Sequence, residues 1–174
     1  MKKYKLTDQN LQTYNGFQCE LGVKKTTSGE GNLCSPGWLH YYHSPLLAVL
    51  LNPIHANIKS PRLFEIKAEG KHLDDNGLKG GCTEMTLVKE LKLPAVTLAQ
   101  KIAFGILCAK EVEKDVAWNL WADKWLSGED RSKDAAAAYA AYAARAACAA
   151  DAAYAAYAEK KLDLKKIAKK AMTY

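Results

Sequence analysis

The sequence predicts an α+β fold, with a small, mostly antiparallel sheet domain over residues 1–94 followed by two long helices within residues 95–174. Two observations carry this prediction. Before Pro94, segments in which apolar residues alternate with polar ones are separated by glycine-containing turns. After Pro94 the sequence contains few glycines, namely Gly105 and Gly128. Beyond Pro94 apolar residues recur every three or four positions, and a long alanine-rich tract follows, which is typical of helices.

Strands are expected where apolar and polar residues alternate. This pattern occurs over residues 17–23, 64–68 and 83–91, and a period of two is the signature of a half-buried strand. The Asp-Asn-Gly sequence at 75–77 has the composition of a tight turn. We therefore expect the second and third strands to pair as an antiparallel hairpin.

An aromatic strand and a short helix are predicted between the first two strands. Residues 38–43 read Trp-Leu-His-Tyr-Tyr-His, and the Ser44-Pro45 pair that follows is suited to a helix N-terminus. Residues 46–51 are apolar throughout, so this helix should be buried. Asn52-Pro53 is expected to end it.

The two long helices are expected to form a hairpin over about 98–126 and 132–171. Thr97 and Gln100 have the spacing of a capping box, and Gly128 is placed to terminate the first helix. An apolar stripe runs from Leu98 to Leu120 on the predicted first helix.

The alanine-rich tract suggests a binding surface. Four tyrosines recur at multiples of three residues and fall on one face of an α-helix: Tyr139, Tyr142, Tyr154 and Tyr157. Small alanines permit close approach of a partner, and tyrosines act as anchors with a polar tip. The tract could pack within a hairpin, form a homodimer or bind another protein. Basic contacts are expected downstream from Lys161, Lys165, Lys166 and Lys169.

The net charge of +6 is concentrated at the chain ends. Such a basic tail is compatible with nucleic acid or an anionic surface as a weaker possibility, because it lacks interleaved aromatic residues. The five cysteines are scattered, which indicates reduced thiols in a cytoplasm. No stretch has the roughly 18 apolar residues of a membrane span, so none is expected. The spacing of Cys34, His40, His43 and His55 fits no standard zinc site, and we predict no metal and no cofactor.

Several blocks of the first domain carry a family resemblance. They are Gly16-Phe-Gln-x-Glu20-Leu-Gly22, Cys34-x-x-Gly-Trp-Leu-His40, Pro45-Leu-x-x-Val49 and Phe64-Glu-x-x-Ala-x-Gly70. Together, over about residues 4–93, they resemble a domain of unknown function that is common in bacteriophage and prophage genomes. The alanine-rich tract resembles the C-terminal helices of immunity proteins and other phage accessory proteins. The resemblance implies a phage protein in the host cytoplasm.

A second resemblance concerns catalysis. A glycine–aromatic strand, a short Pro-Leu-x-Ala helix and a strand bearing a glutamate are similar to the core of ADP-ribosyltransferases. This similarity implies that Tyr42 would stack on nicotinamide and that Glu84 would be the catalytic carboxylate, with His40 beside them. The sequence favours binding over catalysis, because its polar residues gather at no one site. We therefore expect a phage accessory protein that binds a host or phage protein and inhibits a host or anti-phage defence factor. The alternatives are an ADP-ribosyltransferase-like enzyme and nucleic-acid or anionic-surface binding through the tail.

Overall fold

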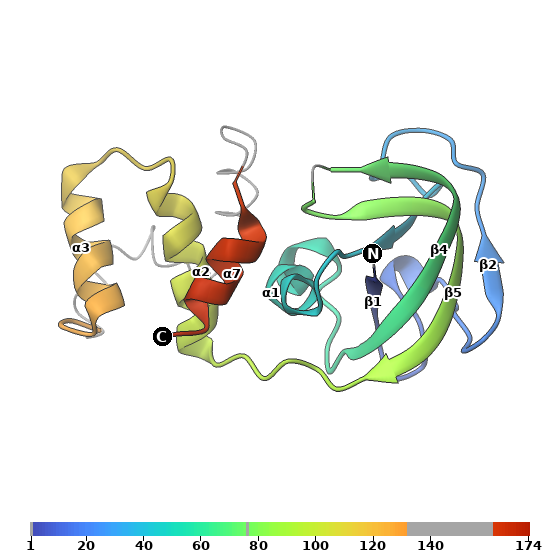
Figure 1. Cartoon of the computed structure of the whole chain (residues 1–174), viewed down its shortest axis with the longest axis horizontal. Coiled ribbons are helices and arrows are strands. Elements are labelled where there is room, and N and C mark those ends of the chain that lie inside the picture. Colours follow the sequence, from blue (N-terminus) through green and yellow to red (C-terminus); the bar gives the residue numbers. More distant parts are fainter. Residues whose placement is uncertain (1, 76, 132–161) are drawn as a thin grey trace. The chain divides into compact units, whose positions relative to one another are not determined.

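The computed structural model describes residues 2–75, 77–131 and 162–174, and these form two compact units (Figure 1). The first unit spans Met1–Ala95 and the second Val96–Tyr174. The described residues contain a five-stranded antiparallel sheet and four α-helices, so the predicted α+β class is confirmed. No helix in the described ranges is both long enough and apolar enough to cross a membrane.

The sheet is built around one long hairpin. Its strands are β1 (Lys3–Thr7), β2 (Lys24–Thr26), β3 (Leu39–Tyr41), β4 (Arg62–Asp74) and β5 (Gly80–Leu91). The order is β1-β4-β5-β2, and β3 also pairs with β5. The predicted antiparallel pairing of the last two strands is confirmed. Its turn is held by hydrogen bonds from the Leu78 amide to the Asp75 carbonyl and from the Gly77 amide to the Asp74 carboxylate.

The strands close into a small barrel. Tyr42, which follows β3, pairs with Tyr4 of β1 through two reciprocal backbone hydrogen bonds of 2.8 and 2.9 Å. Since β1 pairs with β4, β4 with β5 and β5 with β3, this bridge completes the ring. The bridge brings β1 and the segment after β3 together, so that fewer backbone groups stay unpaired at these two edges. The barrel core includes Cys19, Leu39, Tyr41, Phe64, Ile66, Cys82, Met85 and Leu87.

The strand predicted over residues 17–23 is wrong. This segment is a loop that joins β1 to β2, and it turns at Gly16 and Gly22, which both have positive φ. The loop is held by hydrogen bonds from Cys19 to the Leu11 carbonyl and from Gly22 to the Leu87 carbonyl. Alternation misled the prediction because Cys19 is buried, whereas Leu21 remains 53% exposed. The neighbouring strands β1 and β2 were not predicted.

The short helix is longer than expected. Helix α1 spans Pro45–His55, and Ser44 caps it as predicted by accepting a hydrogen bond from the Leu47 amide. The helix continues through Pro53 and ends where the Asn52 side chain bonds both the amide and the carbonyl of Ile58. Its apolar residues Leu47, Ala48, Leu50 and Leu51 are buried, as the sequence indicated.

In the second unit, the predicted continuous helix over 98–126 is wrong. Two helices occupy this stretch, α2 (Leu98–Lys110) and α3 (Val116–Ser127). The break arises because Asp115 caps a new helix by accepting from the Trp118 amide, while the Glu113 carboxylate accepts from the amides of residues 114 and 115. The Thr97 capping box and the left-handed Gly128 at the end of α3 are as predicted.

The break also changes which face is buried. Two side chains of the predicted apolar stripe, Leu98 and Leu120, are 72% and 60% exposed. The tryptophans of α3 are buried instead: Trp118, Trp121 and Trp125. A final helix, α7 (Leu164–Ala171), packs on α2, and the Gln100 amide donates to the Met172 carbonyl over 3.0 Å. Of the second long helix predicted over 132–171, residues 132–161 lie outside the described residues. Its described end is a separate helical start, because Asp163 caps α7 by accepting from the Lys166 amide.

Candidate functional site

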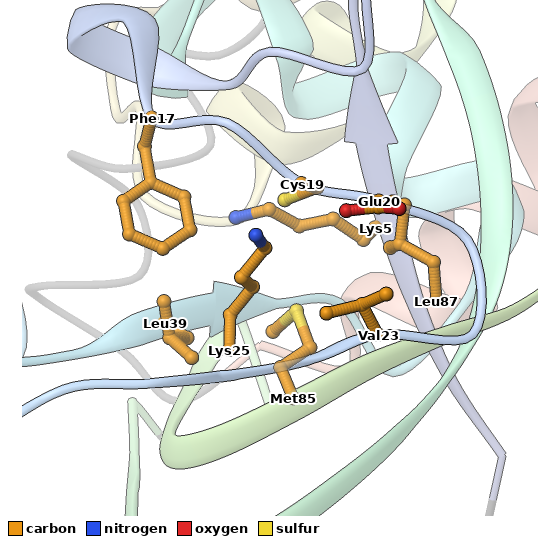
Figure 2. A pocket seen from close by; sticks show the side chains of 9 residues that line it. All are labelled: Lys5, Phe17, Cys19, Glu20, Val23, Lys25, Leu39, Met85 and Leu87. Carbon is orange, nitrogen blue, oxygen red and sulfur yellow. The ribbon is translucent and has the colours of Figure 1, made fainter.

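A pocket opens into the barrel beneath the loop that joins β1 to β2 (Figure 2). Its cavity volume is only about 10 Å³, which is room for about one water molecule. Most of its walls are apolar, but three ionisable side chains and a thiol also face it. The lining residues are Lys5, Phe17, Cys19, Glu20, Val23, Lys25, Leu39, Met85 and Leu87.

Lys5 reaches the pocket because of its position on β1. It pairs with Phe64, a core residue, so both side chains lie on the inner face of the barrel. The Lys5 amine donates a 2.7 Å hydrogen bond to the carbonyl of His40. Burial lowers the pKa of the Lys5 amine, because the low-polarity surroundings disfavour its charged form.

Lys25 brings a second amine to the same space. It pairs with Met85 across β2 and β5, and Figure 2 shows its amine and that of Lys5 both directed between Phe17 and Cys19. Burial raises the pKa of the Cys19 thiol, and the two lysines oppose this shift in part. The thiol therefore stays protonated near neutral pH, so that the site combines two amines with largely apolar walls.

A second polar cluster lies at the β3 end of the hairpin. The Nε2 atom of His43 is 2.5 Å from a carboxylate oxygen of Asp74, and its Nδ1 atom is 2.7 Å from the Lys3 amine. The Lys3 amine also lies 4.6 Å from the centre of the Tyr41 ring. These contacts tie β1, β4 and the segment after β3 together, which supports barrel closure.

The structure separates the residues expected from the ADP-ribosyltransferase resemblance. Tyr42 is buried and stacks on His55, with its hydroxyl 3.0 Å from the His55 Nδ1 atom. The ring of His40 is hydrogen-bonded to the carbonyl of Leu33. Glu84 instead forms a 2.7 Å ion pair with Lys24. No interaction among the described residues joins Glu84 to the other two predicted residues.

Three of the predicted binding lysines lie on α7. Lys165, Lys166 and Lys169 are exposed, and so is Lys170. At about 100° per residue the four span about 140° of the helix surface, opposite the buried Leu164, Ala168 and Ala171. Within the described ranges none of the four forms an ion pair. Lys161 and the tyrosines Tyr139, Tyr142, Tyr154 and Tyr157 lie outside the described residues.

Comparison with known proteins identifies the first unit. Residues 1–99 match the family model of a domain of unknown function, DUF7666. The chain belongs to the DUF7666 family. Neither the curated proteins nor the solved structures give a match to it. The predicted resemblance of residues 4–93 to a domain of unknown function is thereby confirmed.

The barrel and its pocket lie within the DUF7666 domain, whereas the α7 lysines lie beyond it. Sequence reasoning missed the pocket residues Lys5, Cys19 and Lys25. The available signal was the alternation of Lys3 and Lys5 with Tyr4 and Leu6, which places both lysines on one face of a strand. In the parts of the DUF7666 domain that the structure describes, no group of three or more metal-ligating side chains is placed to hold an ion.

Proposed function

We propose that this protein acts by binding an acidic protein partner through the lysine face of α7, defined as Lys165, Lys166, Lys169 and Lys170. The observation that best supports this proposal is that these four exposed lysines form no ion pair among the described residues. Four like charges within two turns repel one another, and an acidic partner relieves that repulsion. The opposite face of α7 is buried at Leu164, Ala168 and Ala171, so the lysines point away from a packed face.

The finer proposal is that the protein is a phage accessory protein that inhibits a bacterial host or anti-phage defence factor in the host cytoplasm. It rests on the family blocks and on the alanine-rich tract that precedes α7. In this proposal the tyrosine face of residues 139–157 and Lys161 extend the contact surface beyond α7. A homodimer through the same tract is the alternative use of that surface.

A capture experiment tests the proposal. The full-length protein is immobilised and exposed to a bacterial lysate treated with nuclease, and the retained proteins are identified by mass spectrometry. Changing all four lysines of the α7 lysine face to Gln should abolish retention of the specific partner. The matched control changes Lys59, Lys71, Lys89 and Lys92 to Gln, because these exposed lysines of the first unit give the same change in charge.

Equal retention by the two quadruple variants would refute the proposal. A partner that neither quadruple variant retains binds through the net charge of the protein, and this result would also count against the proposal. Retention that is seen with an untreated lysate and lost after nuclease treatment would favour the alternative of nucleic-acid binding, which the same lysine face supports. In that case the logarithm of the binding constant for DNA or RNA should fall steeply and linearly with the logarithm of the salt concentration.

Catalysis of the ADP-ribosyltransferase type has weaker support. Its proposed carboxylate, Glu84, is held by Lys24, and its proposed stacking residue, Tyr42, is 8% exposed. A buried ring already stacked on His55 is poorly placed to receive nicotinamide. Stabilisation of the protein by NAD in a thermal-shift assay, lost on Glu84→Gln, would favour the enzyme over the binding protein.

A further inference from the structure

We propose that the DUF7666 domain binds a neutral saccharide in a groove between the loop after β1 and the segment after α1. Helix α1 lies beside β1 (Figure 1), which brings the segments that follow these two elements together. The groove, called the loop groove below, is lined by residues 8–10 and 12–15 on one wall and by residues 56, 58 and 59 on the other. It belongs to the DUF7666 domain, and the proposal is independent of the lysine face of α7.

The loop groove is large enough for a sugar. Its cavity volume is about 430 Å³, within the range of about 300–1,000 Å³ that is usual for small-molecule sites. The pocket beneath the same loop holds about 10 Å³. The loop therefore presents its usable cavity on the side that faces the segment after α1.

Hydrogen bonds fix the shape of the loop groove. One carboxylate oxygen of Asp8 accepts from the backbone amides of Asn10 and Gln12, over 2.9 and 2.8 Å. The Gln9 side chain joins the two walls by donating to the carbonyl of Ser60 over 2.5 Å. A groove that is shaped in advance loses little conformational entropy when a ligand binds.

The backbone of both walls adopts conformations that side chains rarely tolerate. In the part of the chain that the structure describes, the non-glycine residues with positive φ, between 46° and 63°, are Leu11, Asn15, Asn57 and Ser60. Each of the four lines the loop groove or is next in sequence to a residue that does. Such unfavourable conformations cluster at ligand-binding sites, where they hold side chains in a productive arrangement. Their concentration around one cavity is a second observation that points to a ligand.

The polar lining suits a ligand with many hydroxyl groups. A side-chain amide both donates and accepts hydrogen bonds, as a sugar hydroxyl does. The side chains of Asn10, Thr13 and Asn15 form no hydrogen bond with another described residue, so their polar atoms are open to a ligand. The second carboxylate oxygen of Asp8 is open in the same way. The loop groove thus offers donors and acceptors in several directions.

An aromatic ring and the balance of charge narrow the class of ligand. Tyr14 is 67% exposed, so the face of its ring can stack on the C–H face of a sugar. The lining carries one carboxylate, from Asp8, and one amine, from Lys59, which together favour neither an anion nor a cation. A flat base needs apolar surface on both faces, whereas the aliphatic lining is limited to Ala56 and Ile58. These features favour a neutral saccharide over a nucleoside or a charged ligand.

Saturation-transfer NMR with the full-length protein tests the proposal. Neutral disaccharides of glucose, galactose, mannose and N-acetylglucosamine are added one at a time up to about 10 mM, which detects a Kd of about 1 mM. We expect saturable binding of at least one of them, with the strongest saturation on the C–H protons of one sugar ring. Adenosine and glucuronate, titrated in parallel, should bind more weakly than that disaccharide.

Variants of the loop locate the site. Tyr14→Ala should weaken binding of the disaccharide about tenfold because it removes the stacking surface, while Tyr14→Phe should stay within about threefold. Phe17→Ala is the matched control: it removes another exposed ring of the same loop that lies outside the groove, and binding should stay within about twofold. Asn15→Gly removes a side-chain amide at a position whose φ of 58° suits glycine, and binding should weaken about fivefold.

Three results would overturn the proposal. One is the absence of saturable binding by every disaccharide at about 10 mM. Another is tighter binding of adenosine or glucuronate than of any disaccharide. The third is equal loss of affinity in Tyr14→Ala and Phe17→Ala. If Tyr14→Ala alters the circular dichroism of the protein, Asn15→Gly decides the matter, and unchanged binding by that variant would count against the loop groove.

Discussion

His55 should make the protein progressively less stable as the pH falls from neutral to acidic values. Burial, together with the charges of Lys79 and His40, lowers the pKa of His55 from its ordinary value of about 6.5 to about 4. Below pH 6.5 the unfolded chain takes up a proton at His55 that the folded protein resists. The contribution of neutral His55 is therefore complete above pH 6.5 and is lost as the pH falls toward 4. At 1.36 kcal/mol per pKa unit, the loss between pH 7 and pH 4 amounts to about 3 kcal/mol.

Urea unfolding at pH 7, 6, 5 and 4 measures this effect. His55→Phe keeps a ring to stack on Tyr42 but removes the titrating group, so the free energy of unfolding should depend less steeply on pH than in the wild type. The difference between the two proteins should change by about 3 kcal/mol over this range. Replacement of the exposed His72 by Phe makes the same change at another site and controls for the substitution itself. A wild-type minus His55→Phe difference that is constant with pH would refute the reasoning.

Three further predictions concern stability, each measured by urea unfolding at pH 7. Phe64→Ala should lower the free energy of unfolding by about 3–5 kcal/mol, because Phe64 is 1% exposed in the barrel core, whereas Val88→Ala, at 54% exposure, should change it by less than about 0.5 kcal/mol. Asp115→Ala should cost about 1 kcal/mol through loss of the α3 cap, and unchanged hydrogen exchange in the first turn of α3 would contradict this. Gly70→Ala should destabilise the protein more than Gly77→Ala. Both glycines have positive φ, but a Cβ at Gly70 would overlap the Thr83 hydroxyl, while a Cβ at Gly77 would meet open space. Equal costs would count against this close approach of Thr83 to Gly70.

The sequence was most informative where local chemistry decides the structure. The hairpin between β4 and β5, the Ser44 cap, the Thr97 capping box and the Gly128 terminus all follow from side chains within a few residues of each other. Such signals act on the backbone nearby, and distant contacts do not override them.

Features set by distant contacts were missed. Barrel closure depends on Tyr4 meeting Tyr42, and no local pattern encodes a pair so far apart in sequence. The break between α2 and α3 had a local signal in Asp115, but the apolar periodicity across it concealed that signal. A one-residue capping preference is worth about 1 kcal/mol and can still decide a helix boundary when both alternatives bury similar surfaces.

The candidate site was predictable only in part. The exposed lysines of α7 followed from helical periodicity, because Leu164 and Ala168 define the opposite face. The pocket amines could not be found in the same way, since a lysine inside a barrel contradicts the usual burial preference. Lys5 and Lys25 come together only after β1 and β2 join different parts of the sheet.

Lysine footprinting tests most directly whether the protein binds through the lysine face of α7. The protein is acetylated with and without its captured partner, and the modification of each lysine is quantified by mass spectrometry. Lys165, Lys166, Lys169 and Lys170 should be protected by the partner, while Lys59 and Lys89 should react equally in both samples. Undiminished acetylation of the four α7 lysines in the saturated complex would contradict the account.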